Sequence, residues 1–68
     1  MAMTLRAARV NANLTQEQAA KLMGVSANTV SKWEIGKATP NIKRIPIICE
    51  TYGLNGYDDI IFLPDNNA

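Results

Sequence analysis

Four side chains between residues 27 and 32 have the types and spacing to contact base edges from one face of a helix. They are one or four residues apart, so they project from the same side: Ala27, Asn28, Ser31 and Lys32. Asn can pair with adenine, Lys can donate to guanine, and Ala can contact a thymine methyl. A solvated helix face is usually a mixture of Glu, Lys and Arg, whereas this face is small and uncharged except at Lys32. The pattern favours base recognition in a DNA major groove, about 12 Å wide, over the alternative of a plain solvated face.

The sequence contains few of the residues that catalytic or metal-binding sites need. There is no His, which removes the common metal sites and the His-based catalytic triads. The single Cys49 lies in a helical pattern of apolar residues, which indicates a buried thiol. Asp58 and Asp59 are adjacent and suit the positive end of a helix better than they suit acid–base catalysis. We expect no enzyme activity, no cofactor, no metal site and no small-molecule ligand.

Charge is divided unevenly along the sequence, although the net charge is only +1. Residues 1–44 contain all seven basic side chains and two acidic ones, whereas residues 45–68 contain four acidic side chains. This asymmetry suggests a basic face for a polyanion, with the acidic part turned away. Lys37, Lys43 and Arg44 would flank the helix face described above. Each of them either contacts phosphate or is simply solvated, and the sequence leaves both alternatives open.

The elements that must position these residues are short helices joined by tight turns. Thr15 and Gln18 have the spacing of a capping box, Gly24 permits a sharp turn, and Ser26 is a suitable N-cap for the next helix. Gly36 is the natural stop of that helix. No stretch shows a sustained strand alternation. We predict helices over residues 3–12, 16–23, 27–35 and 46–52, followed by a last short helix capped by Asn55 and ended by Pro64.

Pro46 determines where the fourth helix is expected to begin. Proline lacks an N–H and crowds the preceding turn, so it suits the first position of a helix and not its interior. It also disfavours the helical conformation at Ile45. We therefore expect residues 37–44 to form an extended loop or loose turn.

The length of 68 residues allows one domain with one small core. No apolar run approaches the roughly 20 residues that span a bilayer, and the N-terminus lacks the apolar segment of a signal peptide. We expect a single domain over residues 1–68, located in the cytoplasm, with no membrane partner.

The stretch from Leu14 to Pro40 resembles the DNA-binding domains of Cro and the phage repressors, the XRE-type helix-turn-helix family. The residues that carry this resemblance are Thr15, Gln16, Ala20, Gly24, Val25, Ser26, Val30, Trp33, Glu34, Gly36 and Lys37. The resemblance implies an all-α, lambda-repressor-like bundle of about five short helices, with the helix-turn-helix at about residues 15–35. It also implies a phosphate contact at Gln16 and an ion pair between Arg9 and Glu34.

The expected partner is double-stranded DNA, bound by a transcriptional regulator that is a dimer on a palindromic operator. Helix 27–35 would lie in the major groove with its N-terminal residues on base edges. Base contacts would come from Ala27, Asn28, Ser31 and Lys32. Backbone contacts would come from Gln16, Ser26, Thr29, Lys37, Lys43 and Arg44.

The apolar stretch near the C-terminus leaves two alternatives open. Ile61, Phe62 and Leu63 could form the contact of a homodimer, or they could close the core. The alternative function is a protein-interaction or antitoxin-like module on the same fold, which the low net charge and this apolar stretch would suit. Such a module, however, has no need of a basic first half and a helix that fits a groove.

Overall fold

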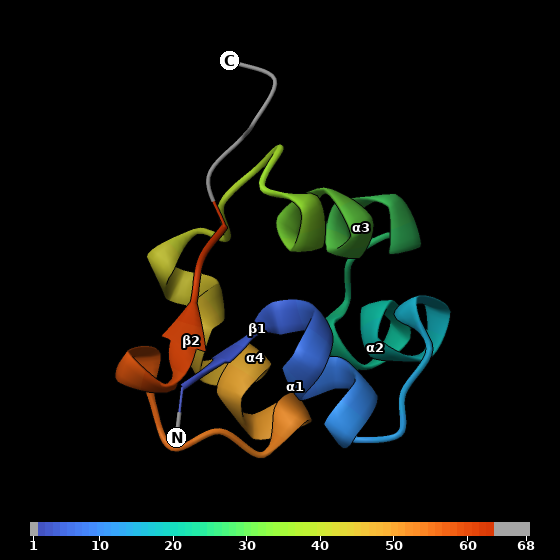
Figure 1. The fold of residues 1–68 in the computed structure, drawn as a ribbon. Coiled ribbons are helices and arrows are strands. Elements are labelled where there is room, and N and C mark those ends of the chain that lie inside the picture. The colour runs from blue at the N-terminus through green and yellow to red at the C-terminus, as the bar shows by residue number, and fades with distance from the viewer. Residues whose placement is uncertain (1, 64–68) are drawn as a thin grey trace.

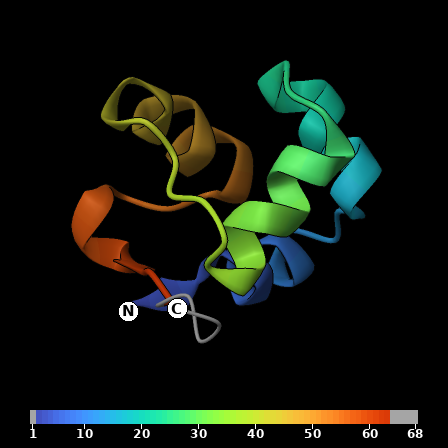
Figure 2. The ribbon, with the colours of Figure 1, turned by 90° about the horizontal axis from the view of Figure 1, so that it is seen from above.

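The structure, a computed structural model, describes residues 2–63, and these form a mostly helical domain (Figures 1 and 2). Its α-helices are α1 (Leu5–Asn11), α2 (Gln16–Met23), α3 (Ala27–Ile35) and α4 (Ile45–Tyr52). Its short elements are the 3₁₀ helices η1 (Ile42–Arg44) and η2 (Tyr57–Asp59) and the strands β1 (Met3–Thr4) and β2 (Ile60–Ile61). The helical bundle predicted from the sequence is confirmed, and α2 and α3 have the predicted bounds.

Local capping explains why α2 and α3 begin and end where they do. The Thr15 hydroxyl accepts the Gln18 backbone N–H at 3.1 Å, and the Gln18 side-chain Oε1 accepts the Thr15 backbone N–H at 2.9 Å. This capping box satisfies two backbone donors that a helix start would otherwise leave open. Gly24 ends α2 in the left-handed conformation, with φ at 72°, and Ser26 caps α3 two residues later. The two helices are therefore held at a sharp turn by residues within the turn itself.

The first helix starts later than the sequence pattern predicts. Thr4 is the N-cap of α1, since its hydroxyl accepts the Ala7 N–H at 3.1 Å. Met3 and Thr4 instead pair in parallel with Ile60 and Ile61, in a register that places Met3 opposite Ile60. A pairing between segments so far apart in the sequence leaves no local signal, so the expectation that residues 3 and 4 are helical was wrong.

The start of α4 also differs from the prediction. Ile45 has helical dihedral angles, and Pro46 occupies the first turn, where its missing N–H has no helical partner to lose. Ile45 is buried in the core, which offsets the modest preference of a residue before proline for extended backbone. Of the two alternatives predicted for the preceding segment, an extended loop or a loose turn, the structure has a turn at its end, because residues 42–44 form η1, capped by the Asn41 side chain.

The last short helix is a 3₁₀ turn followed by a strand. Gly56, and not Asn55, stands at its N-cap, and no side chain caps it. The Asn55 backbone N–H donates to the Asp59 carboxylate at 2.9 Å, so the cap predicted at Asn55 was wrong. Ile60 and Ile61 continue as β2 because β1 offers them backbone hydrogen bonds. The stop predicted at Pro64 lies outside the described residues.

One apolar core holds the four helices together. Its fully buried side chains include Val30 from α3 and Ile48 from α4, and Trp33 is 8% exposed. Cys49 is buried in this core as predicted, and burial raises the pKa of its thiol. The fold therefore fixes one side of α3 against the core and turns the other side outward. Among the helices of residues 2–63, none is long and apolar enough to cross a membrane.

Candidate nucleic-acid interface

The outward side of α3 carries the four residues that the sequence singles out for base recognition. Asn28 and Lys32 are exposed, and Ala27 and Ser31 are partly exposed. Ala27 also packs against the rim of the core, so its methyl is only partly available. Figure 1 shows α3 at the upper edge of the molecule. The structure brings the four residues together on one face, opposite the buried Val30 and Trp33.

Two hydroxyl groups lie at the N-terminal end of α3. The Ser26 Oγ accepts the Thr29 N–H at 3.1 Å and lies 2.9 Å from the Thr29 Oγ1. Because a hydroxyl has one donor and two acceptor positions, the pair retains hydrogen-bonding capacity toward a ligand. The N-terminus of a helix also attracts anions. This end of α3 therefore suits a phosphate oxygen beside the base-reading face.

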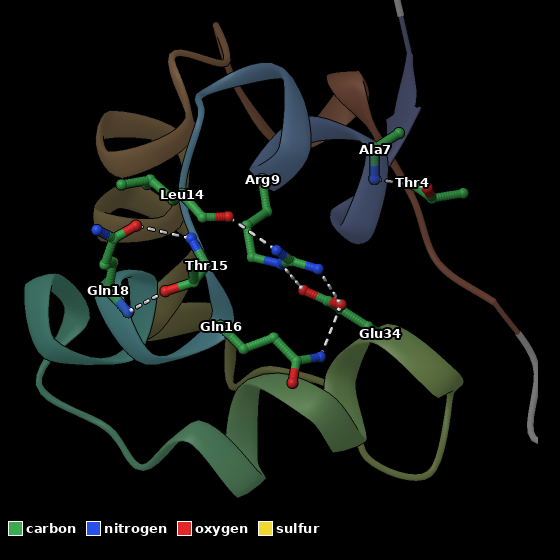
Figure 3. Close-up of polar contacts among 8 residues, drawn as sticks. All are labelled: Thr4, Ala7, Arg9, Leu14, Thr15, Gln16, Gln18 and Glu34. Atoms are coloured by element: carbon green, nitrogen blue, oxygen red, sulfur yellow. Dashed lines mark hydrogen bonds and ion pairs between the residues drawn. The ribbon is translucent and has the colours of Figure 1, made fainter.

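A buried ion pair joins α1 to the C-terminal part of α3 (Figure 3). The Arg9 Nε donates to the Glu34 Oε2 at 2.6 Å, and the Arg9 Nη2 donates to Oε1 at 3.2 Å. The third donor, Nη1, reaches the Leu14 carbonyl at 2.8 Å in the loop before α2. The side chains are only 12% and 3% exposed. The hydrogen bond to Glu34 raises the pKa of Arg9 more than burial lowers it, so the guanidinium stays charged.

Gln16 belongs to the same network. Its Nε2 donates to the Glu34 Oε1 at 3.1 Å, as Figure 3 shows. The Glu34 carboxylate therefore accepts hydrogen bonds from two elements, α1 and α2. Sequence reasoning linked Gln16 to phosphate and Glu34 to Arg9, but it missed this third contact, because a spacing of 18 residues carries no periodic signal.

A surface pocket of about 540 Å³ borders this network. Its polar walls include Gln16, Arg9 and Glu34, and the exposed Arg6 adds a further positive charge. Arg6 had no role in the sequence prediction. The pocket places cationic and amide donors close to the start of α2.

The basic residues after α3 differ in whether their side chains make hydrogen bonds within the domain. Lys37 and Lys43 are exposed. Arg44 donates from Nη1 to the Met23 carbonyl at 3.2 Å, which anchors it at the end of α2. This contact joins η1 to the turn between α2 and α3, so the loop after α3 returns to the helix-turn-helix.

The three apolar residues proposed for a dimer contact differ in exposure. Ile61 is 45% exposed and Leu63 is 46% exposed. Phe62 packs against the core, and its ring lies 5.5 Å from that of Tyr57. Phe62 thus helps to close the core, while its two neighbours face outward.

Comparison with known proteins identifies the family to which the chain belongs. The chain is 40% identical over 50 residues to the HTH-type transcriptional activator BcrR of Enterococcus faecalis. The matched region covers 74% of this chain and 24% of that protein. It is 32% identical over 57 residues to the antitoxin PezA of Streptococcus pneumoniae serotype 4 (strain ATCC BAA-334 / TIGR4), covering 84% of this chain and 35% of that protein. The chain thus spans about a quarter to a third of the length of these relatives. No solved structure gives a significant match. The helix-turn-helix family HTH_3 matches residues 5–57, and the chain therefore belongs to this family of DNA-binding domains.

Proposed function

We propose that this domain is a sequence-specific transcriptional regulator, of the phage-repressor or Cro-like kind, that places α3 in the major groove of DNA. The observation that carries the proposal is the outward face of α3. Within residues 2–63, no hydrogen bond or ion pair engages the side chains of Asn28, Ser31 or Lys32. Their donors and acceptors are therefore available to base edges, while Val30 and Trp33 hold the helix in place.

Phosphate contacts would set the register of α3 in the groove. Gln16 at the start of α2 and the hydroxyl pair of Ser26 and Thr29 would hold the backbone near the start of α3. Lys37, Lys43 and Arg44 would hold it on the other side. Such contacts supply affinity and position, whereas the base contacts of α3 supply sequence preference.

The proposed active form on DNA is a homodimer on a palindromic operator. One copy measures 30 × 25 × 22 Å, and half-sites one helical turn apart are separated by about 34 Å. Each copy presents one α3, so a palindrome with two half-sites would take two copies. The exposed side chains of Ile61 and Leu63, next to Phe62, are the apolar groups proposed for the dimer contact.

A second candidate function is an antitoxin-like or protein-interaction module. It is favoured by the similarity to a protein named an antitoxin and by the apolar side chains that Ile35, Ile61 and Leu63 expose. The two functions are compatible, because the proposed base contacts lie on α3 whereas Ile61 lies in β2 and Leu63 just after it. Ile35, the last residue of α3, lines the same surface pocket as Leu63. DNA selection distinguishes a domain that reads sequence from one that only binds protein.

The test is selection of binding sites from a randomised duplex library at moderate salt, with Lys32→Ala in parallel. We expect a palindrome with half-sites about 10 base pairs apart, and relaxed preference at one position for the variant. Lys21→Ala is the matched control, since it removes the same charge from an exposed position on α2. Salt-sensitive binding without enrichment would contradict the proposal.

A further inference from the structure

We infer that Glu34 is a positioning residue for DNA phosphate binding, acting through the Gln16 side-chain amide. This inference rests on the proposed function, because it concerns how the proposed phosphate contact is made. Glu34 is 3% exposed at its side chain and does not itself face DNA. Its carboxylate would orient Gln16 before DNA arrives.

The first observation behind this inference is the hydrogen bond between the Gln16 amide and the Glu34 carboxylate. A carboxylate only accepts hydrogen bonds, so the Gln16 group that faces it must be the NH₂ and not the carbonyl. The Gln16 Nε2 lies 3.1 Å from the Glu34 Oε1 (Figure 3). That contact uses one of the two amide hydrogens. The second hydrogen remains available on a half-buried side chain that borders the open pocket of about 540 Å³.

The second observation is the ion pair between Arg9 and Glu34, which balances the charge of the carboxylate. A free carboxylate next to a phosphate site would repel the ligand. Arg9 contacts both Glu34 oxygens, at 2.6 and 3.2 Å, and thereby balances this charge. The Arg9 Nη1 is fixed in turn by the Leu14 carbonyl, two residues before Gln16. The Arg9–Glu34 pair thus orients the Gln16 amide, and because the two charges balance, the pair adds little net charge next to the phosphate site.

The consequence is a phosphate donor that is already ordered in the free protein. A glutamine side chain has several rotatable bonds, and ordering them opposes binding. Here the hydrogen bond to Glu34 restricts those bonds before DNA binds. The role assigned to Glu34 therefore goes beyond joining α1 to α3, and a double-mutant cycle can separate the two roles.

The experiment measures affinity for the selected operator in four proteins: the native chain, Gln16→Ala, Glu34→Gln and the double variant. Glu34→Gln keeps the size of the side chain but can face Gln16 with either end of its amide. Thermal unfolding followed by circular dichroism defines a temperature at which all four are folded. Glu17→Gln is the control for charge, because it removes one acidic group from an exposed position next to Gln16.

We expect Gln16→Ala to weaken operator binding roughly fivefold, the usual effect of one hydrogen bond. Glu34→Gln should weaken binding roughly threefold beyond the effect of Glu17→Gln when Gln16 is present, and not at all when Gln16 is Ala. An equal effect of Glu34→Gln in both backgrounds would overturn the inference and leave a purely structural ion pair. An unchanged affinity for Gln16→Ala would overturn both the inference and the proposed phosphate contact.

A second measurement needs no DNA and does not depend on the variants being stable. The Gln16 side-chain amide proton that faces Glu34 should exchange with solvent slowly in the free native protein, because it is held in a hydrogen bond. Exchange as fast as that of a fully solvated side-chain amide would overturn the inference. Failure of the native chain to bind any duplex would contradict the proposed function. The NMR measurement would still show whether the Gln16 amide is held by Glu34, so the two failures can be told apart.

Discussion

At the residue scale, the polar side chains fall into two kinds: buried groups that hold the helices together, and exposed groups that face solvent. Glu34 and Arg9 are nearly buried and satisfy each other, while Asn28 and Lys32 of α3 are left without partners within the described residues. Buried charge is tolerated only when it is paired and hydrogen-bonded. Unpaired polar groups remain on the surface, where they can bind a ligand.

Removing one partner of the buried pair should destabilise the domain strongly. We expect Glu34→Ala to lower the free energy of unfolding by about 3–5 kcal/mol, because it leaves the Arg9 guanidinium buried without its carboxylate. Urea unfolding monitored by Trp33 fluorescence measures the change. Glu17→Ala, at an exposed position, should change it by less than about 0.5 kcal/mol. Equal values for the two variants would contradict the importance of the pair.

The buried phenol of Tyr52 should make stability depend on alkaline pH. Burial, with a smaller contribution from nearby Glu34, raises the pKa of Tyr52 to about 12 against the opposing effect of Arg9. The folded state thus binds the phenol proton more tightly than the unfolded chain does, with its pKa of about 10. The contribution is present below pH 10 and is lost as pH rises from about 10 to about 12.

After allowance for partial solvent screening, this loss should amount to about 1–2 kcal/mol. Urea unfolding at pH 9, 10.5 and 11.5 measures it. Tyr52→Phe is the control, because it removes the titrating group and should flatten this part of the profile. A native profile that matches that of Tyr52→Phe would show that the phenol is not responsible.

At the element scale, caps and turns determine the arrangement of α2 and α3. The capping box at Thr15 and the N-cap at Ser26 begin the two helices, and Gly24 makes the turn between them. These signals are local, and the bounds of both helices are correspondingly correct in the prediction. The outer face of α3 is a consequence of this turn and of the burial of Val30 and Trp33.

Replacing Gly24 tests the turn directly. Its φ of 72° disfavours a residue with a Cβ, although no atom lies within 4 Å of the Cβ position. We expect Gly24→Ala to lower stability by about 1–2 kcal/mol, the cost of the left-handed conformation alone. Gly53 has the same φ and the same open space after α4, so Gly53→Ala should cost the same.

The two variants should differ in their effect on DNA binding. Gly24→Ala changes the turn that orients α3 and should weaken operator binding, measured by fluorescence anisotropy with both proteins folded. Gly53→Ala lies after α4 and should leave the affinity nearly unchanged. Equal losses of affinity would show that the turn has no special part in placing α3.

At the scale of the whole molecule, the division of charge in the sequence becomes a division in space. Figure 1 shows α3 at the upper right and η2 (Tyr57–Asp59), in orange-red, at the lower left. The acidic groups Asp58 and Asp59 belong to η2, away from the proposed DNA face. A polyanion that approaches α3 is therefore kept at a distance from these carboxylates, which reduces repulsion.

The apolar groups at the end of β2 should determine self-association. We expect Leu63→Glu to weaken dimer formation on the operator, seen as loss of cooperative binding to the full palindrome while half-site binding persists. Leu63 is 46% exposed, so the fold should remain intact. Leu22→Glu is the matched control, because Leu22 is 60% exposed on α2. Sedimentation equilibrium with and without DNA measures the stoichiometry, and unchanged cooperativity would place the dimer contact elsewhere.

The sequence by itself determined the helical class of the domain, the helix-turn-helix and the composition of the α3 face. These features depend on signals within a few residues, such as the spacing of Thr15 and Gln18 or the glycine at position 24, and local backbone chemistry responds to them. The family resemblance added Arg9 and Glu34 as a pair, which periodicity alone does not reveal.

Only the tertiary structure decided how distant segments combine. The pairing of Met3 with Ile60, the helical conformation of Ile45 and the contact of Gln16 with Glu34 each depend on neighbours far along the chain. Parallel strand pairing and core burial outweigh local preference when they satisfy backbone groups or remove apolar surface from water. For this reason the residues that face DNA in the proposal were visible in the sequence, while the network expected to orient them required the folded chain.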